Sequence, residues 1–252
     1  MPDEIQTQAP DKFPPTRWSV LEAARSNNPA HRERALETLF AAYWKPVYKY
    51  IRLRWNQQPE DAQDLTQGFF VEFLERNLLL RYDPEKSRLR SYLRLCADSF
   101  VINETKAAHR QKRGGNAQHL ALDFDAAEGE LRNAAIDAAS IPSPASLEEF
   151  FEKEWIRSLF TLAVEDLRKL CEARGRPATF QIFEEYDLDA DENISYEKLA
   201  AKYKLPVTDV TNALAWARRE FRKIALDRLC ESCGSDEEFQ REVLAVFGKQ
   251  AP

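Results

Sequence analysis

Residues 193–229 read NISYEKLAAKYKLPVTDVTNALAWARREFRKIALDRL, and the apolar spacing in this stretch predicts two helices joined by a short turn. Ser195 can cap the first helix, and residues 205–207 can make the turn. In the second helix, apolar residues recur at intervals of three or four, at Val210, Leu214, Ala217, Phe221 and Ile224. This arrangement is typical of a helix-turn-helix.

The opposite face of the second helix is polar and basic. It presents Thr211, Asn212, Ala215, Trp216 and Arg219 outward. Further cations that could reach a phosphate backbone stand beside this face, at Arg218, Arg222 and Lys223. A packing hairpin of two helices shows the same apolar spacing, so the motif alone leaves both interpretations open.

The composition of the whole chain also favours helices. Only 7 glycines occur in 252 residues, and alternating β-branched runs are scarce, which argues against a sheet-rich fold. Hydrophobic residues at 44% are enough for packed cores, and charged residues at 31% suit long solvated helix faces. The length fits one large domain or two small ones, and a change of composition in the middle favours two.

We therefore expect an all-α fold of two helical domains joined by a flexible linker. The linker is Ala-, Asp- and Asn-rich, includes IPSPAS, and has room for one weak helix. In chain order the predicted parts are a flexible tail over 1–16, a helical domain over 17–115, the linker over 116–147, the helix-turn-helix domain over 148–230, and a helical tail over 231–252.

No stretch approaches the ~20 uninterrupted apolar residues that span a bilayer, and the N-terminus has no apolar signal-peptide core. We therefore expect a cytoplasmic protein. The four cysteines do not make a disulfide framework in a chain of this size. Cys230 and Cys233 form a lone C-x-x-C without the further ligands of a zinc site or the βαβ setting of a redox motif, so we expect ordinary thiols.

The segment PEDAQDLTQGFFVEFLER, residues 59–76, predicts a helix with two distinct faces. The apolar face consists of Ala62, Leu65, Phe69 and Phe73. The acidic face consists of Asp61, Asp64, Gly68, Glu72 and Glu75. A glycine in a helix interior costs about 1 kcal/mol relative to alanine, and a partner that approaches closely would explain Gly68. A core helix with a solvated acidic side explains the remaining pattern equally well.

Residues 81–113 carry a local excess of positive charge in a chain whose net charge is −6. Nine basic residues minus four acidic ones give +5 in this segment. It interleaves an aromatic ring with cations, at Arg88, Arg90, Tyr92 and Arg94. A single strand of nucleic acid needs such a stacking surface and such cations. If residues 98–112 form one helix, a polar and basic ridge lines up at Asn103, Lys106, Arg110 and Arg113. A basic helix whose aromatics belong to the core fits the segment equally well.

In their order and spacing, YWKPVYKYIRLRW, DAQDLTQGFFVEFLER and RYDPEKSRLRSYLRLCADSFVINETKAAHRQKRGG resemble the second conserved domain of bacterial RNA polymerase sigma factors of the extracytoplasmic-function (ECF) type. The likeness is closest to long members that begin with a T-R-W-S element, here residues 16–19. It extends from about residue 13 to 245. It implies sigma domain 2 over 17–115 and the helix-turn-helix sigma domain 4 over 148–230.

The resemblance implies a role for each pattern. The acidic helix would dock on the clamp helices of the largest polymerase subunit through Asp61, Asp64, Gln67, Gly68 and Glu72. The basic segment would bind and open promoter DNA at the −10 element through Arg88, Arg90, Tyr92, Arg94, Asn103, Lys106, Arg110 and Arg113. The helix-turn-helix would bind the −35 element through Thr211, Asn212, Trp216, Arg218, Arg219 and Arg222.

The implied partners are core RNA polymerase and promoter DNA, both as duplex and as single strand. An anti-sigma factor or a regulatory kinase would be a further partner, and Thr66 beside the acidic face is either a phosphorylation point or an ordinary helix threonine. We expect no cofactor, no metal and no enzymatic activity. The chain has no phosphate-binding Gly-rich loop, no nucleophile elbow and no constellation of histidine with acids.

Two departures from the family pattern bear on the C-terminal domain. Lys204 stands where the turn usually has Gly, and a residue with a side chain at positive φ would be strained there. Ala215 and Trp216 stand where family members often carry basic or hydrogen-bonding residues, so we expect unusual base recognition at −35.

Two other interpretations stay open. An ordinary helix-turn-helix regulator would bind duplex DNA without polymerase. A sigma-like protein could also be held inactive by a partner or by its own extra segments, namely the N-terminal 30 residues and the tail after Leu229.

Overall fold

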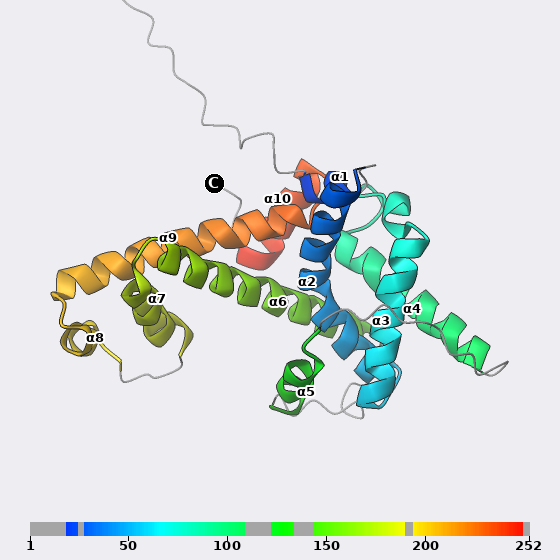
Figure 1. The fold of residues 1–252 in the computed structure, drawn as a ribbon, viewed down its shortest axis with the longest axis horizontal. Coiled ribbons are helices and arrows are strands. Elements are labelled where there is room, and N and C mark those ends of the chain that lie inside the picture. The colour runs from blue at the N-terminus through cyan, green and yellow to red at the C-terminus, as the bar shows by residue number, and fades with distance from the viewer. Residues whose placement is uncertain (1–18, 25–27, 109–121, 134–143, 190–193, 249–252) are drawn as a thin grey trace, which may run out of the picture.

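The computed structural model consists of helices packed into two lobes (Figure 1). It describes residues 19–24, 28–108, 122–133, 144–189 and 194–248. Because these ranges contain helices and turns but no strand, the prediction of an all-α fold is confirmed. None of the helices in them combines the length and the apolar character needed to cross a bilayer.

The elements follow one another in a simple order. The first are α1 (Ser19–Ala24), α2 (Pro29–Arg54), α3 (Pro59–Glu75), the 3-10 helix η1 (Leu78–Arg81), α4 (Leu89–Ala108) and α5 (Phe124–Asn133). They are followed by α6 (Pro144–Ala173), α7 (Pro177–Phe183), the π-helical turn η3 (Glu184–Leu188), α8 (Tyr196–Tyr203), α9 (Val207–Glu231) and α10 (Asp236–Phe247).

The first lobe is a helical bundle built around α2. Asn28 caps this helix by accepting hydrogen bonds from the first backbone N–H groups, and Pro29 occupies the first helical position. The buried face of α2 is aromatic and β-branched, with Tyr43, Val47, Tyr48 and Ile51 all 2% exposed or less. Helices α3, α4, α5 and the first half of α6 pack around it.

The two faces predicted for α3 are present. Ala62, Phe69 and Phe73 are buried, and the ring of Phe69 packs against Phe70, Phe73 and Phe100. Gly68 lies where a Cβ atom would stand 3.0 Å from the Cζ atom of Phe100. The structure therefore accounts for this glycine by the close packing of α4 inside the lobe, and an external partner is not needed to explain it.

The second lobe contains the helix-turn-helix. Ser195 caps α8 by accepting a hydrogen bond from the backbone N–H of Lys198, as predicted. The chain then turns at Lys204 and enters α9 at Val207. Leu199 of α8 and the predicted inward residues Val210, Leu214 and Ala217 of α9 are buried in a core of their own.

The structure divides the chain differently from the predicted domain boundaries. Residues 124–133, which fall in the predicted linker, form α5 and dock on α2 through the buried ring of Phe124. Helix α6 then runs without a break from the first core, at Phe151 and Trp155, into the second core, at Leu167 and Cys171. The physical reason is that apolar residues continue at helical spacing through 147–171, so a single helix can bury one face in both lobes.

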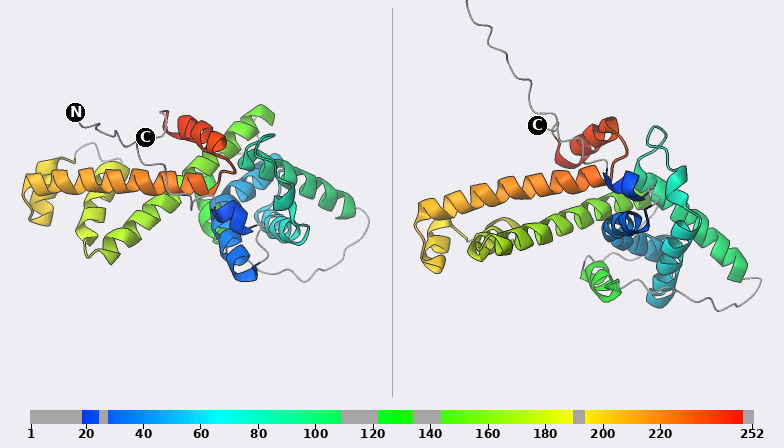
Figure 2. Two further views of the ribbon diagram at one scale, coloured as in Figure 1. Left: turned by 90° about the horizontal axis from the view of Figure 1, so that it is seen from above. Right: turned by 45° about the horizontal axis from the view of Figure 1, so that its top comes forward.

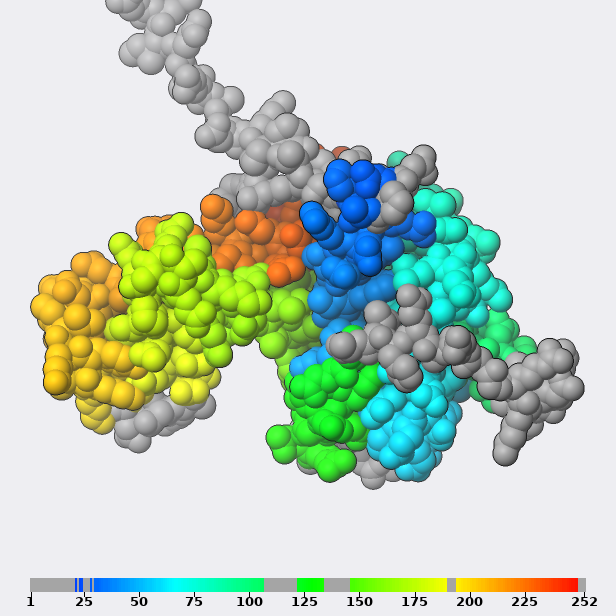
Figure 3. Space-filling model, in the orientation of Figure 1, coloured from blue at the N-terminus to red at the C-terminus, as the bar shows by residue number. Residues whose placement is uncertain are grey.

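Helices α6 and α9 lie side by side and join the two lobes (Figure 1; Figure 2). The space-filling view shows the lobes meeting along these two helices, with an open hollow between α7 and α5 (Figure 3). The tail helix α10 folds back beside the end of α9 and against the first lobe (Figure 2). Its Phe247 ring packs edge-on against Phe160 of α6, so α10 sits at the junction of the lobes.

Lys204 adopts the left-handed backbone conformation, with φ of 54°, that the sequence suggested. This conformation costs a residue with a Cβ atom roughly 1–2 kcal/mol, and glycine avoids the steric part of that cost. We expect Lys204→Gly to raise the free energy of unfolding by up to about 1 kcal/mol. Urea unfolding followed by circular dichroism measures the change. The matched variant Lys202→Gly, inside α8, should lower the free energy of unfolding. If Lys204→Gly lowered it as well, the proposed backbone strain at Lys204 would be contradicted.

Candidate functional site

The predicted docking face of α3 lies at the surface, but its residues differ in availability. Asp61 and Asp64 are exposed, and neither makes an ion pair or hydrogen bond to another described residue. Glu72 is half-buried and pairs with Arg76 at 3.3 Å, and Gln67 is half-buried. Two adjacent unpaired carboxylates are therefore the part of this face that a basic partner can reach directly.

Thr66 lies on the other side of α3. Its side chain is fully buried, and its hydroxyl donates a hydrogen bond of 2.7 Å to the carbonyl oxygen of Ala62. A kinase cannot reach this oxygen while α3 stays packed. In this structure Thr66 is a core residue of the helix.

The structure divides the residues predicted at the −10 element into two groups. Asn103 and Lys106 are exposed on the end of α4 that projects from the lobe (Figure 1). Arg110 and Arg113 lie outside the described residues. The remaining four, Arg88, Arg90, Tyr92 and Arg94, make contacts inside the molecule.

Arg90 is the most deeply enclosed of these four residues. Its side chain is 4% exposed, forms an ion pair with Glu242 of α10, and lies 4.7 Å from the ring centroid of Trp155 on α6. Burial alone would lower the pKa of Arg90, but Glu242 and Glu152 raise it above the ordinary value. The guanidinium thus joins α4, α6 and α10, and it is not available to DNA in this arrangement.

The neighbouring arginines and Tyr92 are also occupied. The Nε atom of Arg88 lies 3.1 Å from an oxygen of Glu242, and Arg94 pairs with Glu148 at 2.6 Å. The hydroxyl of Tyr92 donates a hydrogen bond of 2.6 Å to the carbonyl oxygen of Leu78. The three arginines of the predicted segment are therefore paired with carboxylates of α6 and α10, and the Tyr92 hydroxyl is bound by the backbone of η1.

A second carboxylate of α10 holds the backbone just before α4. Glu238 is 1% exposed and accepts hydrogen bonds from the Tyr82 hydroxyl at 2.8 Å, from the Leu89 N–H at 3.1 Å and from the Gly234 N–H at 2.7 Å. Burial and Glu238 raise the pKa of Tyr82 well above its ordinary value, so this hydroxyl remains a donor. Four protein groups, on α4 and on the segment just before it, thus depend on two carboxylates of the tail.

A further basic cluster, which was not predicted from the sequence, lies on α2. Lys49, 1% exposed, pairs with Glu154 of α6 and with Glu130 of α5. Glu128 of α5 accepts hydrogen bonds from Arg52 and from the Tyr48 hydroxyl, each at 2.6 Å. Burial opposes the ionisation of Glu128, but these hydrogen bonds hold its pKa below the ordinary value. The signal for this cluster in the sequence was the run of acidic residues within 123–130. Their partners on α2 lie more than seventy positions earlier in the chain, so the sequence alone did not show which groups they meet.

The helix-turn-helix face is more open. Thr211, Asn212 and Arg219 are exposed on the outward side of α9. Arg218 is engaged by Asp187 of η3 through contacts of 2.7 Å and 2.9 Å, and these hydrogen bonds raise the pKa of Arg218. Arg222 lies over the ring of Phe247, 5.8 Å from its centroid.

Trp216 is half-buried, and its ring contacts two arginines that were not predicted from the sequence. The guanidinium carbons of Arg174 and Arg176 lie 5.4 Å and 5.7 Å from the centroid of its ring. Both arginines belong to the turn between α6 and α7. The only signal in the sequence was the R-G-R triplet at the predicted break between those helices.

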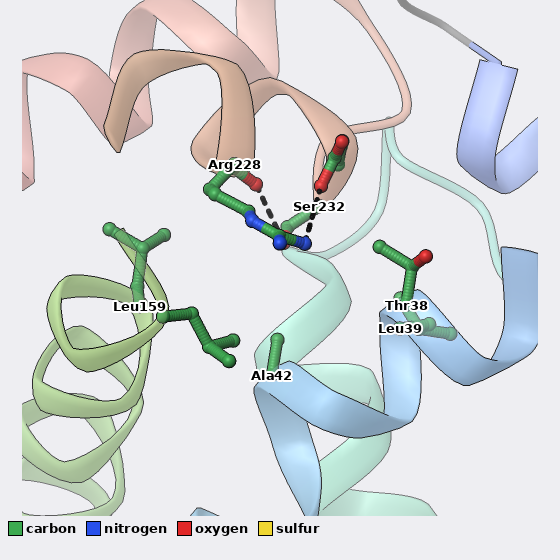
Figure 4. Close-up of a pocket in the computed structure, with 8 residues that line it drawn as sticks. Thr38, Leu39, Ala42, Leu159, Arg228 and Ser232 are labelled. Atoms are coloured by element: carbon green, nitrogen blue, oxygen red, sulfur yellow. Dashed lines mark hydrogen bonds and ion pairs between the residues drawn. The ribbon is translucent and has the colours of Figure 1, made fainter. Parts of the chain in front are cut away.

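The junction of the lobes contains a small hollow between α2, α6 and α9 (Figure 4). Its lining includes Leu39, Ala42 and Leu159 together with the polar groups of Arg228 and Ser232. The hollow measures about 10 Å³, which is no more than one water molecule occupies. It is part of the packing between the lobes and is too small for a ligand.

Cys233 is buried, and its thiol contacts the carbonyl oxygen of Leu229 at 3.2 Å. Burial raises the pKa of this thiol, which makes it a poor nucleophile and a poor metal ligand. No disulfide joins the four cysteines, and the described residues contain no cluster of side chains that could hold a metal ion.

Comparison with family models, with curated proteins and with solved structures found no match to this chain.

The buried pair of Arg90 and Glu242 makes a quantitative expectation possible. Glu242→Gln should lower the free energy of unfolding by about 3 kcal/mol, because the guanidinium would remain buried without its counter-charge. The matched change Glu149→Gln breaks an exposed pair with Lys153 and should have little effect. Urea unfolding compares the two variants, and equal stabilities would contradict a buried, tightly coupled pair.

Proposed function

We propose that this protein is a sigma factor of the ECF type, which binds core RNA polymerase and directs promoter recognition and opening. The observation that carries the proposal is the pair of exposed, unpaired carboxylates Asp61 and Asp64 on a helix whose opposite face is locked into a core. The same chain carries a well-formed helix-turn-helix with a polar outward face. A polymerase-docking face and a DNA-binding motif in one small protein fit the resemblance noted in the sequence.

The proposed mechanism assigns one step to each exposed surface. The carboxylates of α3 dock on the basic clamp helices of polymerase, where opposite charges steer and orient the complex. The outward face of α9 enters the major groove of the upstream promoter element. Asn103 and Lys106 on α4 approach the downstream element, where strand separation begins. The chain uses no ATP in this scheme, because stacking and phosphate contacts offset the lost base pairs.

The contacts of Arg88, Arg90 and Arg94 add a regulatory step to this mechanism. Because carboxylates of α6 and α10 hold these arginines, the described arrangement represents a closed state in which their guanidinium groups are engaged by carboxylates in place of a single strand. Promoter opening then requires that α10 leave its position against α4. Binding to polymerase or to DNA supplies the competing charge in this scheme.

The same observation favours a second candidate, a helix-turn-helix regulator that acts on duplex DNA without polymerase. In that case the contacts of Arg90 are permanent, and the first lobe is a scaffold for α6 and α9. The two candidates differ in one property, the affinity for core polymerase.

The double variant Asp61→Arg with Asp64→Arg should abolish association with purified core RNA polymerase. Both carboxylates are exposed and unpaired, so the reversed charges repel the partner without disturbing the core. A pull-down with core polymerase measures association, and circular dichroism checks the fold.

The matched control is Glu33→Arg with Glu37→Arg, which reverses two exposed carboxylates at helical spacing on α2. It should bind polymerase as the unmodified protein does. If the unmodified protein also fails to bind, the sigma proposal is wrong and the regulator remains. If the α3 variant binds normally, the docking role of these carboxylates is wrong.

Release of α10 can be tested in the complete complex with polymerase. Glu242→Gln weakens the hold on Arg88 and Arg90 and should increase permanganate reactivity of promoter thymines several-fold relative to Glu149→Gln. Limited proteolysis reports whether α10 has become accessible. An accessible α10 with unchanged thymine reactivity would contradict the closed state.

A further inference from the structure

The turn between α6 and α7 places two arginines against the recognition helix α9. Gly175 adopts φ of 66°, which reverses the chain and leaves Arg174 and Arg176 on the same side of the turn. Their guanidinium groups lie over the ring of Trp216, at 5.4 Å and 5.7 Å. The indole ring thereby orients two cations that would otherwise be mobile on an exposed turn.

The charges of these arginines are not neutralised within the part of the chain that the structure describes. Neither Arg174 nor Arg176 makes an ion pair there, and both are exposed. Three other cations of the second lobe are engaged by carboxylates: Arg168 with Glu184, Lys202 with Glu185, and Arg218 with Asp187. In an acidic protein of net charge −6, two adjacent unpaired arginines are a local feature that suits an anion.

Their position relative to α9 indicates which anion. Residues two positions apart on a helix project to opposite flanks, so Trp216 and Arg218 lie on either side of the outward face formed by Asn212 and Arg219. When a recognition helix enters the major groove, the phosphate backbones pass along its two flanks. The flank at Trp216 carries the unpaired arginines, whereas Arg218 on the other flank is paired with Asp187.

We propose that Arg174 and Arg176 bind a phosphate backbone of the duplex that α9 enters, with Trp216 holding their side chains in position. This inference rests on DNA binding by the helix-turn-helix, and it applies to both candidate functions. It assigns the phosphate contact to the turn before α7, whereas the sequence had pointed to Arg218, Arg222 and Lys223 on α9. A guanidinium presents a planar fork of donors that matches a phosphate, and its orientation by the indole reduces the freedom lost on binding.

The test measures the salt dependence of DNA affinity. The probe is a duplex selected from a random-sequence library by the full chain, with core polymerase added if the chain alone enriches none. The variant Arg174→Ala with Arg176→Ala should bind more weakly, and its slope of log affinity against log salt should be shallower by about 0.9 for each lost phosphate contact. The loss should be similar for matched and mismatched sequences, since phosphates carry no base information.

Two further variants separate charge from structure. Arg174→Gln with Arg176→Gln keeps a polar cover over Trp216 but removes the charges, and it should reproduce the change in slope. Arg168→Ala with Glu184→Gln removes a paired arginine of the same lobe together with its carboxylate, and it should leave the slope unchanged. Thermal unfolding of each variant reports on the fold.

The outcomes distinguish the inference from the proposal on which it rests. A normal slope in the glutamine variant overturns the phosphate contact and leaves the arginines as a structural cover for Trp216. An equal change in slope in the Arg168 and Glu184 variant also overturns it, because the slope would then report on any arginine of the second lobe. Failure of the unmodified protein to select any duplex, with or without polymerase, overturns DNA binding itself.

Discussion

Burial of the Arg90 guanidinium removes a permanent charge from water, and such a charge is tolerated in a protein interior only when a counter-charge lies against it. Glu242 provides that counter-charge, and the ring of Trp155 covers the face of the guanidinium. The three groups come from α10, α6 and α4, which are far apart in the sequence. Their meeting fixes the tail helix against the first lobe and, through Phe247 and Phe160, against the junction with the second.

The same electrostatic logic extends over the basic face of the first lobe. Carboxylates of α5 pair with Lys49 and Arg52 of α2, while carboxylates of α6 and α10 pair with Arg88, Arg90 and Arg94. These acidic groups occupy positions where the phosphates of a nucleic acid would lie if the predicted functions of α4 are correct. In the proposed mechanism, these pairs keep the arginine-rich segment folded until a stronger polyanion or a partner competes for it.

Within the part of the chain that the structure describes, two charged surfaces that matter for the proposed function lie outside this internal neutralisation. The carboxylates of α3 and the arginines beside Trp216 project from opposite lobes, and they have opposite charge. One suits a basic protein surface and the other suits a phosphate backbone. Because α6 and α9 are continuous helices that enter both cores, the two surfaces are held in a defined relation and are not joined by a loose tether.

The sequence by itself determined the helical class, the cap at Ser195, the strained position of Lys204 and the inward faces of α3 and α9. These properties follow from local spacing, backbone preferences and the periodicity of a helix, which act over a few residues. Only the tertiary structure decided that the predicted linker contains a docked helix, that Gly68 accommodates Phe100, and that Arg90 faces Glu242 and not solvent. The reason is that an exposed arginine and a buried, paired one have the same local pattern, and only the position of a carboxylate 152 residues away distinguishes them.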